Sequence, residues 1–295
     1  AGCDNIEIRN CKLLANPNST ESNTYGFNKP TGGVCNNIRL IGNLISGGYY
    51  GLYLRGASTA VGGYNTNIYI DSNTIEKAYY YSVYYYYNDL NSFSYNKVYP
   101  RDGGSSHYNV YSYYSNHYRT VGNVFSTAKT SINNTYTSFY YTQHFNYTAD
   151  ALIANNEVIH SEKSTAGYGL YMAYTQGMVK IYNNTIYAPG SSAYGIYVNC
   201  NTGAGTFELM NNNIWANNYP IYKTGTLATF VSDYNNLYST GAYVGSYNAV
   251  NCASLTAWGN QSGDLTSVRV APDFLDKTES LDLISNVGLT CPILQ

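Results

Sequence analysis

Charged side chains are scarce in this sequence of 295 residues. Lysine and arginine together number 15, aspartate and glutamate 17, and charged residues make up only 11% of the chain. A protein that holds a phosphate backbone needs a concentration of basic residues, and this composition does not supply one. We therefore expect no nucleic-acid partner.

Long apolar runs and helical periodicity are also missing. No stretch approaches the ~18 consecutive apolar residues of a membrane-spanning helix, so we expect no membrane span. No segment sustains the 3.6-residue spacing of apolar positions that indicates an amphipathic helix. The six cysteines form no CxxC pair, which makes a structural zinc site improbable.

Tyrosine, by contrast, is abundant, with 37 copies, and the chain is repetitive. One phrase, Asn-x-aliphatic or Asn-x-Phe, returns at intervals of roughly 23–33 residues, within the range typical of repeat architectures. Its asparagines are Asn43, Asn73, Asn96, Asn123, Asn156, Asn184, Asn212 and Asn235. At a turn they would stack into an amide ladder.

A second phrase, Tyr-Gly-aliphatic-Tyr in its cleanest form, interleaves with the first, for example at Tyr50–Tyr53, Tyr168–Tyr171 and Tyr194–Tyr197. Apolar positions alternate within each unit, as in Ile68-Tyr69-Ile70, which indicates strands with one buried face. The pattern predicts an all-β solenoid in which each strand pairs with its equivalent one coil away. We expect about eight to nine coils over residues 1–238, and a cap or inter-subunit junction over residues 239–295.

This pattern resembles the right-handed parallel β-helix repeat family, the pectate-lyase-like superfamily. The segments Ser232–Tyr238, Leu255–Trp258 and Ala271–Phe274 look like the closing part of secreted Bacteroidota β-helix proteins. The resemblance implies a right-handed coil and an extracellular or cell-surface location. It leaves the activity open, because the superfamily contains lyases, hydrolases, epimerases, phage spikes and adhesins.

The enzyme motifs of that superfamily can be tested one by one. The polygalacturonase set (Asn-Thr-Asp, Asp-Asp, Gly-His-Gly, Arg-Ile-Lys) does not occur, nor does the alginate epimerase Asp-Pro-His-Glu. The pectate lyase Trp-x-Asp-His is absent too, since Trp215 and Trp258 are followed by Ala216-Asn217 and Gly259-Asn260. We assign no catalytic residue and no cofactor, and keep a polysaccharide lyase or hydrolase as the alternative.

Two weaker constellations stand out. Consecutive coils would align Asp89, His117 and His144 in one column, a set able to hold a divalent metal or share a proton. A solvated polar turn is the simpler interpretation of that column. Arg101-Asp102 lies in a Gly-rich stretch, where a turn is again the simpler interpretation.

Alternation also predicts which tyrosines face outward. With Leu52, Val83 and Val110 buried, the following tyrosines form one exposed column, and further tyrosines run beside it. The expected contact face comprises Tyr53, Tyr84, Tyr86, Tyr111, Tyr113, Tyr141, Tyr171, Tyr197 and Tyr222, with Phe139 in the same column. A contiguous aromatic strip indicates an interaction surface for sugar rings or a neighbouring solenoid; mutual stacking that stiffens the sheet is the structural alternative.

The cysteines suggest two disulfides. Aligning Cys3–Ile8 with Cys35–Leu40 places Cys3 one coil from Cys35, and stacked Cα atoms about 4.8 Å apart lie within disulfide range. We expect Cys3–Cys35, and less directly Cys252–Cys291, with Cys11 and Cys200 unpaired.

These observations favour an extracellular structural or adhesive β-solenoid. A strand pattern (Ile6-Glu7-Ile8) begins almost at residue 1, which suggests either that a capping segment has been removed or that copies assemble head-to-tail into a filament. The alternatives are a polysaccharide-degrading enzyme and a non-catalytic carbohydrate-binding β-helix.

Overall fold

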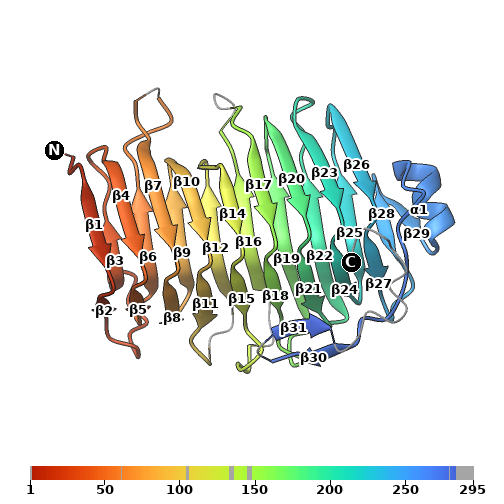
Figure 1. Cartoon of the computed structure of the whole chain (residues 1–295), viewed down its shortest axis with the longest axis horizontal. Helices are drawn as coiled ribbons and strands as arrows, with labels where there is room; N and C mark the ends of the chain where they lie inside the picture. The colour runs from red at the N-terminus through yellow and green to blue at the C-terminus, as the bar shows by residue number, and fades with distance from the viewer. Residues whose placement is uncertain are drawn as a thin grey trace.

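The chain forms a parallel β-solenoid of about eight turns in a computed structural model (Figure 1). The structure describes residues 2–60, 62–103, 106–132, 136–144, 148–278 and 280–283. Three long sheets run along its axis, and each coil contributes one strand to each sheet. The predicted all-β solenoid is confirmed.

The three sheets are named A, B and C in the order in which the chain enters them. Sheet A contains β1 (Ile6–Arg9), β4 (Asn36–Ile41), β7 (Asn65–Asp71), β10 (Asn88–Ser94), β14 (Arg119–Val121), β17 (Ala151–Ala154), β20 (Met178–Tyr182), β23 (Thr206–Met210) and β26 (Thr229–Asp233), with β13 (Asn116–His117) also paired to β10. Sheet B contains β2 (Lys12–Leu14), β5 (Leu44–Ser46), β8 (Thr74–Ala78), β11 (Lys97–Pro100), β15 (Val124–Ser126), β18 (Glu157–Ile159), β21 (Thr185–Ala188), β24 (Asn213–Ala216) and β27 (Asn236–Tyr238). Sheet C contains β3 (Tyr25–Lys29), β6 (Tyr50–Arg55), β9 (Tyr81–Tyr86), β12 (His107–Tyr113), β16 (Tyr136–Thr142), β19 (Ala166–Ala173), β22 (Ser192–Asn199), β25 (Tyr219–Thr224), β28 (Gly245–Tyr247) and β29 (Val250–Cys252).

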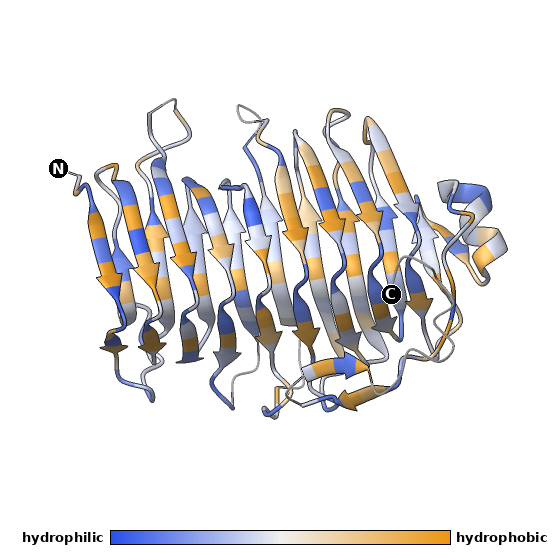
Figure 2. Cartoon of the chain, viewed as in Figure 1, coloured by the Kyte–Doolittle hydropathy of each residue, from blue (hydrophilic) through white to orange (hydrophobic). Residues whose placement is uncertain are grey.

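Apolar side chains stack into columns inside the coil, as the alternating colours of the strands indicate (Figure 2). The clearest column comes from sheet B, where one residue per strand is fully buried and pairs in register with the next. Its members are Ile45, Ile75, Val98, Phe125, Val158, Ile186, Ile214 and Leu237. Burial of each such side chain favours folding by about 1.5–3 kcal/mol.

A continuous asparagine ladder lies at the tight turn between sheets A and B. In each ladder asparagine, from Asn43 to Asn212, the backbone N–H and Nδ2 both donate to Oδ1 of the next one, at 2.9 to 3.1 Å. Nδ2 also donates backward, as from Asn123 to the Phe93 carbonyl at 2.8 Å. The residue before each ladder position has positive φ, a conformation that glycine and asparagine adopt at low cost. The predicted ladder is confirmed.

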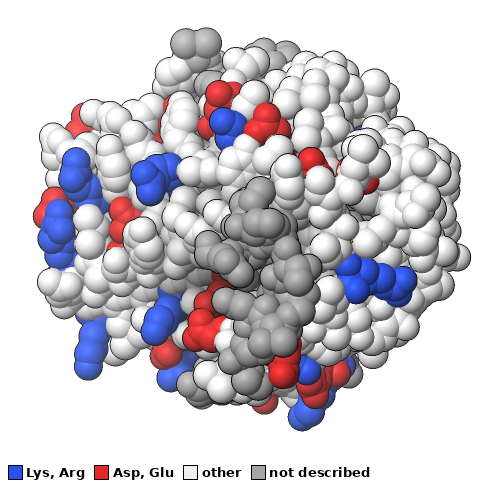
Figure 3. All heavy atoms as spheres, turned by 45° about the vertical axis from the view of Figure 1, so that its right-hand side comes forward, with Lys and Arg blue, Asp and Glu red and all other residues white. Residues whose placement is uncertain are grey.

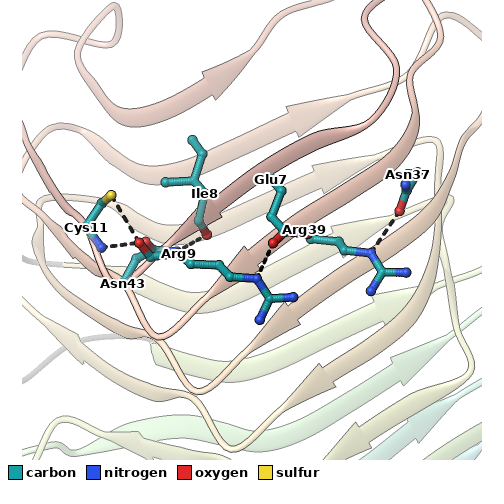
Figure 4. A network of polar contacts seen from close by, with 7 residues as sticks. All are labelled: Glu7, Ile8, Arg9, Cys11, Asn37, Arg39 and Asn43. Carbon is teal, nitrogen blue, oxygen red and sulfur yellow. Dashed lines mark hydrogen bonds and ion pairs between the residues drawn. The ribbon is translucent and has the colours of Figure 1, made fainter.

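The first coil carries cysteine at the ladder position. The Cys11 backbone N–H donates to Asn43 Oδ1 at 2.9 Å, and its thiol donates to the Arg9 carbonyl (Figure 4). Asn43 Nδ2 donates back to the Ile8 carbonyl at 2.9 Å. Beside this turn Arg9 forms an ion pair with Glu7. The outer surface of the first coil therefore carries an ion pair next to the amide hydrogen bonds of Asn43.

The two ends of the solenoid differ. The outer edges of β1, β2 and β3 pair with no described strand. At the other end α1 (Leu255–Ser262) packs on β26, β28 and β29, and Trp258, fully buried, donates to Asp264 Oδ2 at 3.1 Å. The backbone of Val268 pairs with Leu237 and Asn235, which covers the end of sheet B. The predicted boundary at residue 239 stays a prediction.

The chain then turns back along the outside of the coil. The hairpin of β30 (Phe274–Asp276) and β31 (Ser280–Leu283) lies against the outer face of sheet B, below β18 and β21 in Figure 1. Phe274 packs on Tyr187 and Trp215, and the Leu281 N–H donates to Glu157 Oε2 at 3.1 Å. Among the described residues, no helix has the length and apolar character needed to cross a bilayer.

The predicted Cys3–Cys35 disulfide is wrong. The coil register is as expected, with Ile6 opposite Ile38, but both cysteines are free thiols. Cys35 is buried whereas Cys3 is exposed, and the contact between them is the Cys3 N–H donating to Cys35 Sγ at 3.2 Å. The strand register therefore places the two cysteines in neighbouring coils, but their side chains do not point toward each other.

Cys11 and Cys200, which were expected to be unpaired, are free thiols. Cys11 is exposed, whereas Cys200 and Cys252 are buried. The predicted partner of Cys252, Cys291, lies outside the described residues, so the Cys252–Cys291 pairing stays a prediction.

We expect the substitution Asn123→Ala to destabilise the fold by about 2–4 kcal/mol, because it leaves buried donors of Asn96 without an acceptor. Urea unfolding followed by circular dichroism measures the change. Asn18→Ala, at an exposed turn, is the control and should shift stability by less than about 0.5 kcal/mol. Equal loss in both variants would show that the ladder adds nothing.

Candidate functional site

The outer face of sheet C carries two parallel columns of tyrosine. The first contains Tyr25, Tyr50, Tyr81, Tyr108, Tyr168, Tyr194 and Tyr219, with Thr137 at the position between Tyr108 and Tyr168. The second contains Tyr53, Tyr84, Tyr111, Tyr140, Tyr171, Tyr197 and Tyr222. We call these residues together the tyrosine face. The tyrosines are all half-buried, whereas Thr137 is buried.

Across the coils most neighbouring rings of a column stack nearly parallel, although Thr137 interrupts the first column and Tyr140 and Tyr171 are tilted by 35°. Centroids in the second column are 4.7 to 5.3 Å apart, and the Tyr53 and Tyr84 rings are only 3° from parallel. Within a strand the two columns meet edge to face, as between Tyr50 and Tyr53 at 5.1 Å and 75°. Both arrangements suit the ring quadrupoles. The face is therefore a rigid herringbone array of rings.

Several hydroxyls of this array stay protonated. Burial and, to a smaller extent, the neighbouring phenols raise the pKa of Tyr84 to about 12. The pKa of Tyr111 and of Tyr197 is raised for the same two reasons. At neutral pH these three tyrosines thus present ring edges and neutral hydroxyl groups, each able to donate and accept a hydrogen bond.

Further aromatic residues border the face. Tyr86 and Tyr113 stack at 5.2 Å on the outer side of β9 and β12, and the Arg55 guanidinium lies 4.9 Å from the Tyr86 ring. At the following turn Tyr87 and Tyr114 have positive φ. Their rings stand against Tyr86 and Tyr113 at 4.1 Å, which extends the aromatic surface around the corner of the coil.

The predicted outward direction is confirmed for most residues of the expected contact face, whereas their role in contact stays a prediction. Tyr53, Tyr84, Tyr86, Tyr111, Tyr113, Tyr171, Tyr197 and Tyr222 all lie on the outer side of sheet C. The prediction that Phe139 and Tyr141 face outward is wrong, since both side chains are fully buried. Phe139 pairs with Val110 and Tyr140 with Tyr111, so β16 is shifted by one residue from the expected alignment. A one-residue shift moves every side chain to the opposite face.

The first tyrosine column was not predicted, because strict alternation would turn it inward. In β6 two successive residues, Gly51 and Leu52, are both buried, so Tyr50 and Tyr53 both face out. A Cβ on Gly51 would lie 2.6 Å from the Ser82 carbonyl oxygen, so the backbone at Gly51 packs too closely on the next coil for a larger side chain. The repeated Tyr-Gly dipeptide in the sequence could have indicated that the tyrosine before the glycine faces outward.

The expected metal column does not form. Asp89 pairs in register with Asn116, which donates to its Oδ1 at 2.5 Å, while His117 pairs with Leu90 and points into the coil. His144 stands edge-on to the Tyr114 ring at 5.0 Å. No group of metal-ligating side chains occurs within the described ranges.

His117 instead belongs to the core. Its Nε2 lies 2.9 Å from Ser112 Oγ and its Nδ1 lies 3.0 Å from Thr120 Oγ1. Burial lowers the pKa of His117 to about 3, and does the same to the pKa of His107 and of His160. The three imidazoles are therefore neutral in the folded protein.

Acid should destabilise the fold through these histidines. An unfolded histidine has a pKa near 6.5, so below that pH the unfolded chain binds protons that the folded chain does not. Stability is fully present above about pH 6.5 and falls toward pH 3, by up to about 1.4 kcal/mol per pH unit for each histidine. Urea titrations between pH 5 and 6.5 measure this slope. His117→Gln should lower it by about one proton, whereas Thr120→Val should lower stability without changing it. An unaltered slope in His117→Gln would contradict the assignment.

Comparison of the chain with protein-family models, with curated proteins and with solved structures found no match. What is established is the parallel β-solenoid and its tyrosine-rich aromatic surface.

Proposed function

We propose that this protein is an extracellular structural or adhesive β-solenoid that uses the tyrosine face as its contact face. The observation that carries the proposal is the continuity of the face, in which neighbouring rings from Tyr53 to Tyr222 remain in contact, with centroids 4.7 to 5.3 Å apart. A contiguous aromatic surface of this extent is typical of interaction sites. The location is supported by the resemblance of the closing segments to secreted β-helix proteins.

The geometry suits contact with a flat, uncharged partner surface. The rings are already fixed by their neighbours, so a partner that settles on them costs little side-chain entropy. Tyrosine offers an apolar ring together with a hydroxyl group, the combination that stacks on sugar rings and also packs against another protein. The neutral hydroxyls can hydrogen-bond either partner.

Head-to-tail assembly into a filament is part of the proposal. In the part of the chain that the structure describes, nothing pairs with the outer strand edges of β1, β2 and β3, whereas α1 and residues 264–270 lie across the other end. When two copies stack along the axis, an uncovered sheet edge of one copy therefore does not meet an uncovered sheet edge of the other. A junction would set the strand edges of one copy against the cap of the next, and such a translation does not close into a ring.

The double substitution Tyr84→Ser with Tyr111→Ser tests the contact face. These rings stack at 5.3 Å in the middle of the second column. Two lost aromatic contacts should weaken binding by about 1–3 kcal/mol, or roughly 5- to 150-fold. Binding is measured on a panel of immobilised polysaccharides, and self-association by sedimentation velocity and electron microscopy of the native protein.

Tyr95→Asn provides the matched control. Tyr95 is 61% exposed, lies at the turn between sheets A and B, and has positive φ that asparagine tolerates. This variant should keep full binding. The proposal fails if the unmodified protein shows neither saturable glycan binding nor concentration-dependent association, or if Tyr95→Asn loses as much as the double variant.

A further inference from the structure

Basic residues gather around one cleft on the outer face of sheet B. The cleft has a volume of about 610 Å³ and its floor is formed by β8, β11 and β15. A second hollow of about 300 Å³ adjoins it and shares Asp102, Lys129, Thr130 and Thr278. The basic residues that line the two are Lys77, Lys97, Arg101, Lys129, Lys163 and Lys277.

This clustering contrasts with the rest of the molecule. The whole chain has only 15 lysines and arginines, so a large part of its positive charge lies around these two hollows. Most of the surface seen in Figure 3 carries no charge at all. The described acidic residues in the lining are fewer, namely Glu76, Asp102 and Glu162. Charges of one sign along a cleft add their fields and attract an anion.

Two residues hold the walls of the cleft in place. Arg101 donates to the carbonyl oxygens of Pro17, at 2.6 Å, and Ser19, at 3.2 Å, and stacks on the Tyr79 ring. Asp102 Oδ1 accepts from the backbone N–H and the hydroxyl of Ser131, both at 2.6 Å. Loops from three different coils are thereby tied together. The cleft is preformed, which lowers the entropy cost of binding.

Some of the basic residues are already engaged within the protein. Lys77 pairs with Glu76 at 3.0 Å, and Lys277 lies over the rings of Tyr187 and Trp215. Lys97 differs, because its exposed side chain on the floor makes no ion pair or hydrogen bond with the residues that the structure describes. Its charge is available to a ligand.

The lining also offers flat apolar surface. Tyr99 lies two residues after Lys97 on the same side of β11, and Pro17 and Pro100 border the same cleft. Ring faces of tyrosine and proline suit a sugar ring, whereas lysine ammonium groups suit compact oxyanions as point charges. The volume lies within the range of small-ligand sites, about 300–1,000 Å³.

We propose that this cleft binds a small sugar that carries sulfate or phosphate ester groups. Lys97 contacts an ester group from the floor, and Tyr99 with Pro17 contacts the ring. Arg101 and Asp102 are positioning residues, since each acts by fixing a wall. The site lies on sheet B, apart from the tyrosine face on sheet C, so it is independent of the contact function proposed above.

Isothermal titration calorimetry with sucrose octasulfate tests the proposal, with sucrose and inorganic sulfate as the comparison ligands. Saturable binding of the octasulfate is expected, with no heat from sucrose and much weaker binding of sulfate alone. Lys97→Ala should weaken octasulfate binding about tenfold or more, as loss of a charge-assisted contact does. Glucose 6-phosphate, tested in parallel, separates phosphate from sulfate preference.

Lys12→Ala is the matched control. Lys12 occupies the same outward column of sheet B as Lys97, through Leu44 and Thr74, but does not line the cleft. It should change the affinity by less than about twofold, because a distant surface charge contributes little. No saturable octasulfate binding, equal loss in Lys12→Ala, or equally strong binding of sulfate alone would each overturn the proposal.

Discussion

The hydrogen-bonded register between successive coils is the constraint on which the other features depend. Parallel strands lie about 4.8 Å apart, so each residue stands directly above its equivalent in the neighbouring coil. That spacing lets one asparagine amide reach the next, and it is also close to the stacking distance of aromatic rings, 4.7 to 5.3 Å in the second tyrosine column. The internal ladder and the external face thus arise from one repeat distance.

The ladder in turn protects the register. An asparagine displaced by one residue would lose both donors to the next coil and leave a buried amide unpaired, at a cost of about 1–3 kcal/mol for each group. The aromatic columns add a similar penalty on the outside, because a shifted strand would turn its tyrosines inward. The asparagine ladder at the turns and the tyrosine columns on the surface therefore favour the same alignment of the coils. Agreement between them lets a sequence with few charges specify one fold.

Much of the architecture was readable from the sequence for that reason. All eight ladder asparagines and six of the seven second-column tyrosines followed from the interleaved phrases. In β16 the phrase is degraded to Tyr136-Thr137-Ser138-Phe139, and the alignment slipped there by one residue. His117 could not be placed, since its inward direction depends on hydroxyl partners, Ser112 and Thr120, that no pattern in the sequence marks. The cleft was missed because its basic residues come from strands and loops of several different coils.

A solenoid can also keep unrelated surfaces on different sides, and here their physical chemistry differs. The tyrosine face consists of uncharged ring and hydroxyl groups, and burial with the neighbouring phenols raises the pKa of Tyr84 to about 12. Contacts made there depend on apolar area and hydrogen bonds, and added salt screens them little. The cleft on sheet B attracts its ligand through lysine charge, which salt screens strongly because the Debye length is only about 8 Å at physiological ionic strength. Ionic strength therefore separates the two surfaces: an interaction that survives high salt belongs to the tyrosine face, and one that disappears belongs to the cleft.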